Sequence, residues 1–387
     1  MKVPLSVLLF AATLAALALP AAGRKSSQGQ SKSAAHGKPK SADTEAATQL
    51  QVFLDRANFS PGPIDGKYGE FTLKALALYR QSGNEQPPVS SSQSPSPSAS
   101  PQPSPSPSPS PSRAKADTAP DTTGLDLASI GQTLITYTVT DADLKNIGPL
   151  PSEVPAKAKL KFLPYRNAAE AVAEKFHCEP RFLEQLNPGK TKTIKVGDQL
   201  KVPNVEPFEL TAVKDLKPGS ETNSPPTDQA ANDMADEGDA GKENDKSAEQ
   251  GQPAVSVTVD TGTNMLAVHE ADKIIAVYPV TIGSGQTESP IGEWKVKGIA
   301  KLPKFRYDEQ MLKHGERSGN FHMLPPGPNS PVGVIWIALN KKGIGLHGTD
   351  DPDNIGRATS HGCVRLTNWD VVRLAQKVKS GTPVSIH

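Results

Sequence analysis

The pattern of hydrophobic and polar positions divides the chain into segments of different structure. It is clearest in residues 254–387, where short alternating or β-branched runs are separated by turn-forming residues, as in strands joined by hairpins. Strands are expected at residues 255–259, 265–268, 274–278, 294–296, 334–337 and 384–386. Helical spacing occurs at residues 369–378, with Asn368 as the expected N-cap. This segment is therefore predicted to be a mainly β domain.

A helical pattern marks residues 44–83. Leu50 and Leu54 belong to an apolar cluster at helical spacing, a Pro- and Gly-rich turn follows, and a second helix is expected at residues 72–79. The segment is predicted to be a small α-helical domain.

Residues 133–205 show a third pattern, in which strand-like runs enclose two short helical ones. The predicted order is strand, helix, helix, strand. Residues 141–165, which contain several prolines, interrupt this order directly after the first strand.

The segments between these patterns have compositions that cannot build a core. Residues 24–43 are basic and small, residues 84–125 are rich in Ser and Pro, and residues 206–253 are acidic, so all three are predicted to be disordered. The chain of 387 residues contains 37 prolines and only 5% aromatic residues, in keeping with long linkers. Its net charge of +1 argues against a polyanionic partner, and no nucleic acid partner is expected.

The first residues predict export from the cytoplasm. Lys2 precedes an apolar run, and small residues end at Gly23 before a basic pair, which is typical of a signal peptide at residues 1–23. A single membrane anchor is the alternative, but the run is short for a span and contains Pro4. After cleavage no membrane anchor is expected, and the predicted location is the periplasm or cell-wall space.

A longer excursion at residues 299–331 interrupts the strand pattern of the last segment. It contains Phe305, Tyr307 and Phe321. Loops of this length in compact domains are usually functional, so we interpret it as a lid that excludes water from an active site. An ordinary packed loop is the alternative.

The candidate chemistry lies near the C-terminus, where a cysteine and two histidines share one glycine-containing stretch. Cys363 follows Gly362, and His347 and His361 are the available bases. A cysteine needs a nearby base or positive field to act as a nucleophile, which favours cysteine catalysis. The alternatives are a buried, inert Cys363 and a zinc site, which would lack a fourth ligand; no metal is expected.

The second cysteine, Cys178, lies within an apolar pattern. We interpret it as a core residue, because a bridge to Cys363 would block the proposed nucleophile.

These residues resemble a known family. From about residue 254 to residue 387 the chain resembles the L,D-transpeptidase catalytic domain of the YkuD type, through HGT at residues 347–349, SHGCVRL at residues 360–366 and PIG at residues 290–292. The resemblance implies a β-sandwich that cross-links bacterial peptidoglycan without a cofactor.

The resemblance also implies roles for single residues. Cys363 is the nucleophile, His347 accepts and donates the proton, the Gly348 carbonyl orients His347, and Gly362 supplies an oxyanion-hole amide. Such an amide typically contributes about 2.7–4 kcal/mol. The residues expected to bind substrate are Ser360, His361 and Arg365.

Two further resemblances concern the earlier segments. Residues 44–83 resemble a peptidoglycan-binding domain through the turn at residues 61–69, and residues 133–205 resemble a βααβ LysM domain. The expected fold is thus multidomain, with both modules joined to a mainly β catalytic domain by disordered linkers. The insertion at residues 141–165 departs from the LysM pattern.

The resemblance predicts an L,D-transpeptidase. It would be acylated by the diamino-acid residue of a donor tetrapeptide stem, release D-alanine, and transfer the acyl group to an acceptor stem as a 3-3 cross-link. The alternatives are an L,D-carboxypeptidase on the same scaffold and a catalytically silent wall-binding protein. The expected partner is peptidoglycan, and the protein is expected to be a monomer.

Overall fold

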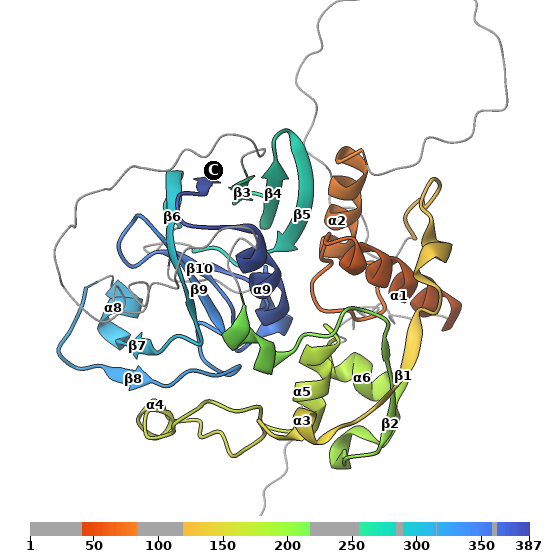
Figure 1. Ribbon diagram of the computed structural model, residues 1–387, viewed down its shortest axis with the longest axis horizontal. Coiled ribbons are helices and arrows are strands. Elements are labelled where there is room, and N and C mark those ends of the chain that lie inside the picture. The colour runs from red at the N-terminus through yellow and green to blue at the C-terminus, as the bar shows by residue number, and fades with distance from the viewer. Residues whose placement is uncertain (1–40, 84–118, 217–254, 284–288, 315, 358–361) are drawn as a thin grey trace, which may run out of the picture. The chain divides into compact units, whose positions relative to one another are not determined.

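The computed structural model describes residues 41–83, 119–216, 255–283, 289–314, 316–357 and 362–387 (Figure 1). The predicted signal peptide at residues 1–23, most of the basic arm, and residues 84–118 and 217–253 of the two predicted linkers lie outside the described residues. The described residues all belong to one compact unit.

The first described segment is a pair of helices, α1 (Ser41–Arg56) and α2 (Glu70–Gln81). The buried side chain of Gln51 holds the turn between them. Its Nε2 donates to Asp65 Oδ1 at 2.9 Å, and its Oε1 accepts from the Gly66 backbone N–H at 2.9 Å. Because α1 begins at Ser41, the predicted basic arm ends earlier than residue 43.

The second segment has the predicted order of strands and helices. Strand β1 (Leu134–Thr138) pairs antiparallel with β2 (Gln199–Pro203), and α5 (Ala168–Lys175) and α6 (Pro180–Leu186) lie between them in the chain. Asn187 joins α6 to β2, since its Nδ2 donates to the Lys201 carbonyl at 2.8 Å. The assignment of this segment as a LysM domain stays a prediction.

The insertion and the connecting segments are also ordered in the described residues. The insertion holds two single-turn helices, α3 (Asp141–Leu144) and α4 (Val154–Lys157). Short 3₁₀ helices occur as η1 (Leu127–Ile130), η2 (Thr191–Thr193), η3 (Leu210–Asp215) and η5 (Pro352–Asn354).

The C-terminal segment contains an eight-stranded sheet in the order β11-β10-β9-β6-β12-β3-β4-β5. Its strands are β3 (Val255–Asp260), β4 (Met265–Glu270), β5 (Lys273–Pro279), β6 (Gly292–Lys301), β9 (Ile335–Leu339), β10 (Gly345–His347), β11 (Val364–Arg365) and β12 (Pro383–Ile386). Strand β6 pairs with β12 through its first residues and with β9 through its last. Its register shifts between Val296 and Gly298, and such a bulge bends a strand, so β6 joins two halves of the sheet around one core.

Each predicted strand of this segment overlaps an observed one, and the predicted helix is α9 (Asn368–Lys377). Its N-cap is Thr367, whose hydroxyl accepts from the Asp370 N–H at 3.2 Å. The prediction of Asn368 as the cap is therefore wrong by one residue. This leaves the Asn368 side chain available for contacts with other segments.

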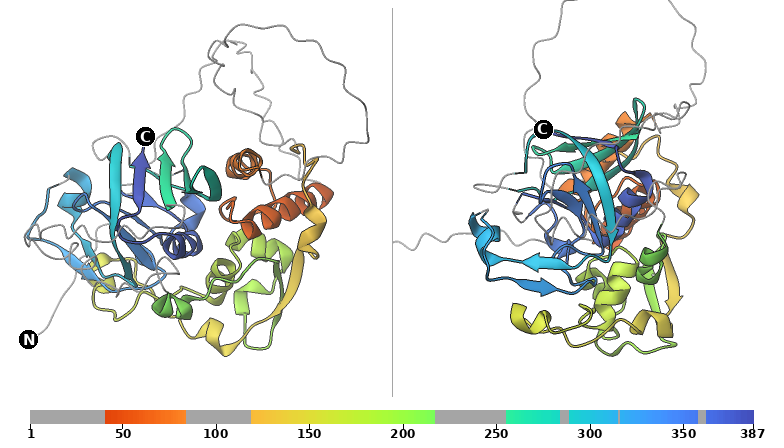
Figure 2. Two further views of the ribbon diagram at one scale, coloured as in Figure 1. Left: turned by 45° about the horizontal axis from the view of Figure 1, so that its top comes forward. Right: turned by 60° about the vertical axis from the view of Figure 1, so that its left-hand side comes forward.

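The described part of the excursion at residues 299–331 starts with the end of β6 and continues into a hairpin. Strands β7 (Phe305–Tyr307) and β8 (His322–Leu324) pair antiparallel, with α8 (Glu309–His314) between them. Figure 2 shows this hairpin next to α4, and α4 contacts β8. The insertion of the second segment therefore packs against the predicted lid.

The described modules share a hydrophobic core with the C-terminal sheet. One buried cluster contains Leu50 of α1, Phe182 of α6, and Met265 and Val277 of the sheet. The chain after α1 also pairs with the edge strand β5, because Ser60 N donates to the Val277 carbonyl at 2.9 Å. The sequence predicts modules joined by disordered linkers; in the described residues the modules also pack directly on the sheet.

The edges of the predicted linkers are ordered as well. Phe208, Val213 and Leu216 are buried in the core of the sheet, although residues 206–216 were predicted to be part of a disordered linker. Leu125, at the end of the predicted Ser/Pro linker, packs against the core that the modules share. Apolar residues at both linker ends therefore extend the packed unit beyond the predicted boundaries.

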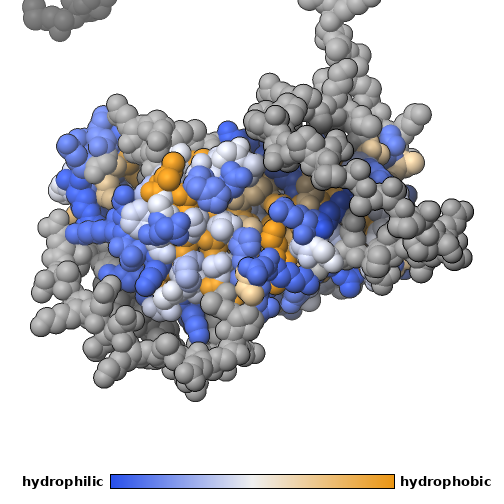
Figure 3. Space-filling view, turned by 90° about the horizontal axis from the view of Figure 1, so that it is seen from above, coloured by the Kyte–Doolittle hydropathy of each residue, from blue (hydrophilic) through white to orange (hydrophobic). Residues whose placement is uncertain are grey.

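None of the helices in the described residues has the length and apolar character needed to cross a membrane. The face in Figure 3 mixes hydrophobic with hydrophilic residues. The large hydrophobic residues that are exposed among the described ones are Val196, Ile291 and Phe321, which come from separate segments.

Candidate active site

The candidate nucleophile and base lie on adjacent parallel strands. His347 ends β10, and Cys363 directly precedes β11; Leu346 pairs with Val364 and His347 with Arg365. Leu346 and Val364 are completely buried in the core of the sheet. Because side chains alternate between the faces of a sheet, His347, Cys363 and Arg365 belong to the opposite face. The fold thus brings together residues that the sequence had suggested as partners.

The Cys363 side chain packs at the edge of a small apolar cluster. The cluster contains Ala300, Val332, Trp336 and Ala338, and Phe305 of the β7–β8 hairpin packs against it together with Cys363. The predicted lid therefore supplies an apolar wall beside the thiol. Apolar groups of this kind limit the access of water to a side chain.

The backbone around Cys363 has a conformation that favours glycine. The φ angle of Gly362 is 99°, in a region that residues with a side chain rarely adopt. The Cys363 Sγ lies 3.5 Å from the Gly343 carbonyl oxygen. Gly362 therefore allows the sharp turn that places Cys363 at the start of β11.

The ring of His347 is fixed on two sides. Its Nδ1 lies 2.7 Å from the Gly348 carbonyl oxygen, and its ring stacks on Trp336 with centroids 5.1 Å apart and planes 17° apart. A carbonyl oxygen only accepts hydrogen bonds, so Nδ1 carries the proton. The neutral ring consequently offers Nε2 as the proton acceptor.

Gly348 is required by close packing as well. A Cβ at this position would lie 2.2 Å from Asn368 Oδ1. Asn368 Oδ1 accepts from the Val334 N–H at 3.2 Å, while its Nδ2 donates to Glu174 Oε1 at 2.6 Å. The amide thus links α5 of the second segment to the chain before β9, and it packs closely against Gly348.

The protonation states follow from the surroundings. Although Cys363 keeps some exposed surface, burial raises the pKa of its thiol to about 11. Burial of the imidazole and the positive charge of Arg365 lower the pKa of His347 to about 3, while the bond to the Gly348 carbonyl opposes this shift. At neutral pH both groups are therefore uncharged, and attack by the sulfur requires transfer of its proton to a base.

A polar pocket of about 340 Å³ includes Arg365. Its lining consists of Arg166, Thr281, Thr349, Asp350, Asp351, Asn354, Ile355 and Arg365. The pocket therefore lies beside β11, the strand that directly follows Cys363, and most of its lining is polar or charged.

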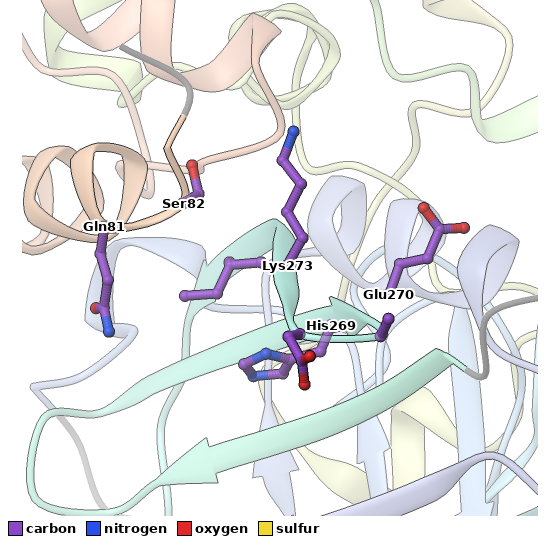
Figure 4. A pocket seen from close by; sticks show the side chains of 8 residues that line it. Gln81, Ser82, His269, Glu270 and Lys273 are labelled. Atoms are coloured by element: carbon purple, nitrogen blue, oxygen red, sulfur yellow. The ribbon is translucent and has the colours of Figure 1, made fainter.

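A second pocket, of about 500 Å³, lies between the end of α2 and the β4–β5 hairpin (Figure 4). Gln81, Ser82, His269, Glu270 and Lys273 contribute to its lining. None of the residues that line it is a candidate catalytic residue. The pocket beside Arg365 is therefore the one that concerns the chemistry.

The remaining predicted site residues have different outcomes. Ser360 and His361 lie outside the described residues. Gly362 is buried next to Cys363. The described residues include no group of three or more His, Cys, Asp or Glu side chains that could hold a metal ion. Cys178 is buried, and burial raises the pKa of its thiol well above the usual range.

Sequence reasoning missed Trp336, Asn368 and Glu174. Trp336 lies in a predicted strand, but only the register of β9 on β10 places it opposite His347. Asn368 had been interpreted as a cap, and Glu174 lies far away in the sequence. No local pattern links these residues to the site.

The chain is similar to known proteins over this part. Residues 254–386 match the YkuD family model, described as the L,D-transpeptidase catalytic domain. The putative L,D-transpeptidase YqjB of Bacillus subtilis is 34% identical over 135 residues, which are 34% of this chain and 69% of that protein. The putative L,D-transpeptidase YkuD of Bacillus licheniformis is 32% identical over 130 residues, which are 34% of this chain and 64% of that protein.

Among solved structures, L,D-transpeptidase 3 from Mycobacterium tuberculosis aligns with 35% of this chain and 61% of its own, at 16% identity and a TM-score of 0.29. The chain therefore spans just under two thirds of the B. licheniformis relative, and its first 253 residues lie outside the family match.

Proposed function

Because this chain belongs to the L,D-transpeptidase family through a YkuD-type catalytic domain, we propose that it is a cysteine-dependent acyltransferase of peptidoglycan stem peptides. The observation that carries the proposal is the fixed His347 ring. Its Nδ1 donates to the Gly348 carbonyl, so Nε2 is the nitrogen that can accept a proton, and Cys363 directly precedes the neighbouring strand β11.

The first half of the reaction forms a thioester. As the Cys363 sulfur attacks the carbonyl carbon of the diamino-acid residue, its proton moves to His347 Nε2. The backbone amides at Gly362 and Cys363 stabilise the oxyanion. When the carbon–nitrogen bond breaks, His347 returns the proton to the leaving amine, and D-alanine departs. The neutral thiol and neutral imidazole are the right starting forms for this exchange.

The second half transfers the acyl group. An amine of an acceptor stem attacks the thioester carbon, His347 removes a proton from that amine, and the Cys363 sulfur leaves as the thiol after receiving the proton. The product is a 3-3 cross-link. Water in place of the amine would give a carboxypeptidase, and the apolar wall formed by Phe305 favours the amine by limiting the access of water.

The proposal also covers the roles of the other segments and site residues, the oligomeric state and the location of the protein. The helical pair and the βααβ segment are proposed to bind the cell wall, His361 and Ser360 to bind substrate with Arg365, and the protein to act as a monomer outside the cytoplasm. No step of the proposed reaction needs a cofactor or a metal.

The test is incubation of the purified protein with defined tetrapeptide muropeptides. Intact-protein mass measures acylation of Cys363, and product mass measures dimers and released D-alanine. We expect both a thioester and dimers, and the Cys363→Ala variant is the control. D-alanine without dimers would mean a hydrolase, and neither acylation nor products would mean a wall-binding protein without catalysis.

A further inference from the structure

The pocket beside Arg365 combines two positive and two negative side chains. Arg166 and Arg365 line it together with Asp350 and Asp351. Its volume of about 340 Å³ is at the lower end of the range for small-ligand sites. A ligand that pairs with both kinds of charge carries a negative and a positive group close together, as the free amino-acid end of a side chain does with its carboxylate and its ammonium group.

Arg166 does not belong to the family-matched part of the chain. It precedes α5, whereas the family match begins at residue 254. Its charge also reaches Asp350, where it acts against the rise of the pKa that burial causes. The second segment thus adds a charged group to a pocket that otherwise consists of catalytic-domain residues.

The position of Arg166 is fixed by a chain of hydrogen bonds. Its Nη1 donates to Glu170 Oε1 at 2.7 Å, and its backbone N–H donates to Glu170 Oε2 at 2.7 Å. Asn329 of the catalytic domain donates from Nδ2 to the same Glu170 Oε1 at 2.9 Å. Glu170 therefore links the guanidinium to the chain that leads from the β7–β8 hairpin to β9.

The insertion at residues 141–165 makes this link possible. Leu163 N donates to the Pro326 carbonyl at 2.8 Å, and Asn329 Nδ2 donates to the Pro164 carbonyl at 2.7 Å. These contacts come directly before Arg166 in the chain. The insertion, which departs from the LysM pattern, is thus one of the parts of the second segment that dock on the catalytic domain.

We propose that Arg166 and Arg365 bind the carboxylate, and Asp350 and Asp351 the ammonium, of the amino-acid head group at the side-chain end of a diamino acid. The inference rests on the proposed function for the identity of the peptide. It predicts a preference for a diamino acid that carries a distal carboxylate, such as 2,6-diaminopimelic acid, over lysine. The insertion then serves to place a specificity residue in the site.

The test compares three tetrapeptides that contain 2,6-diaminopimelic acid, its distal amide or lysine at the third position. Acylation of Cys363 without an acceptor measures binding as donor, and transfer from the preformed thioester measures binding as acceptor. The variants are Arg166→Gln and Arg166→Lys. Lys192→Ala, an exposed change in the same segment, is the control.

In either the acylation or the transfer measurement, we expect Arg166→Gln to raise KM at least tenfold for the diaminopimelic peptide. The same variant should raise KM less than threefold for the amide and lysine peptides. Arg166→Lys should recover most of the loss, and kcat should change little. An equal effect on all three peptides, or no effect in either arm, would overturn the proposal.

A binding measurement separates this inference from the proposed function. Free 2,6-diaminopimelic acid is titrated by calorimetry into the Cys363→Ala variant, with and without Arg166→Gln. Binding that depends on Arg166 supports the pocket even where no turnover occurs. If turnover is the same with and without Arg166→Gln and free 2,6-diaminopimelic acid does not bind, the proposed pocket is wrong, while the proposed function is unaffected.

Discussion

Replacement of Asp55 tests whether the first module is part of the folded enzyme. Asp55, on α1, is completely buried and pairs with two groups from other segments. Arg373 of α9 donates from Nη2 to Oδ1 at 3.0 Å and from Nη1 to Oδ2 at 3.2 Å, and His177 Nδ1 lies 3.0 Å from Oδ2. These partners hold the pKa of Asp55 well below its usual range, despite the opposing effect of burial.

Asp55→Ala leaves the guanidinium of Arg373 without its carboxylate, and the Arg373 side chain is only 11% exposed. Removal of one partner of a buried ion pair typically costs about 3–5 kcal/mol. Because whole domains are stable by about 5–15 kcal/mol, this loss is a large fraction of the total. Glu45→Ala, on the exposed side of the same helix, should change the free energy of unfolding by less than about 0.5 kcal/mol.

The assay is urea unfolding followed by tryptophan fluorescence. Trp369 stacks on His177 with centroids 5.1 Å apart and planes 9° apart, so its emission reports on this interface. The difference between Asp55→Ala and wild type should shrink below about pH 4, since the ionised Asp55 stabilises the fold only above its unfolded pKa.

A double-mutant cycle with Arg373→Met isolates the ion pair. The double variant should lose less stability than the sum of the single losses, by about 0.5–3 kcal/mol. Additive losses, or a loss below about 1 kcal/mol for Asp55→Ala, would show that α1 does not dock on α9 in solution.

Three further predictions concern the site and its surroundings. Cys363→Ala should abolish acylation and leave the urea midpoint nearly unchanged, whereas Cys178→Ala should keep activity; more than about a hundredth of wild-type turnover in Cys363→Ala would remove that residue from the mechanism. His347→Gln should lower kcat by the ~10²–10⁴-fold typical of a lost general base, and by more than His361→Gln does. The pH profile of wild-type kcat should lack an acid limb near pH 6.5, because burial lowers the pKa of His347 to about 3. Burial raises the pKa of Asp370 from 3.8 to about 7, so between these pH values the folded state binds a proton that the unfolded state releases, and the stability of the wild type falls as pH rises. The free energy of unfolding of Asp370→Asn, measured with urea, should therefore rise relative to wild type by up to about 4 kcal/mol between pH 4 and pH 8. A difference between the two proteins that does not change with pH would contradict this.

The sequence predicted the longer strands because their alternation reflects a sheet with one buried face. Strands β10 and β11 are too short to show a period, and they form because Leu346 and Val364 pair inside the core. Their register could not be read from the sequence. It depends on long-range pairing that local propensity does not specify.

The candidate site was predicted in part for a similar reason. Cys363 and His347 were found because their residue types carry the chemistry by themselves. The residues that hold His347 are polar or aromatic groups with no local signature. Asn368, for example, reaches Glu174 across 194 positions of the sequence, and that contact exists only in the folded unit.

The shared core changes how wall binding must be tested. If disordered linkers were the only connection of the modules, deletion of residues 24–250 would spare the catalytic domain. In the structure, that deletion removes Leu50 and Phe182 from a cluster that also contains Met265 and Val277 of the sheet. Burial of one large apolar side chain contributes about 1.5–3 kcal/mol, so the truncated protein is expected to lose stability as well as any binding. Point changes on the exposed surface of the modules therefore separate binding from folding, and truncation does not.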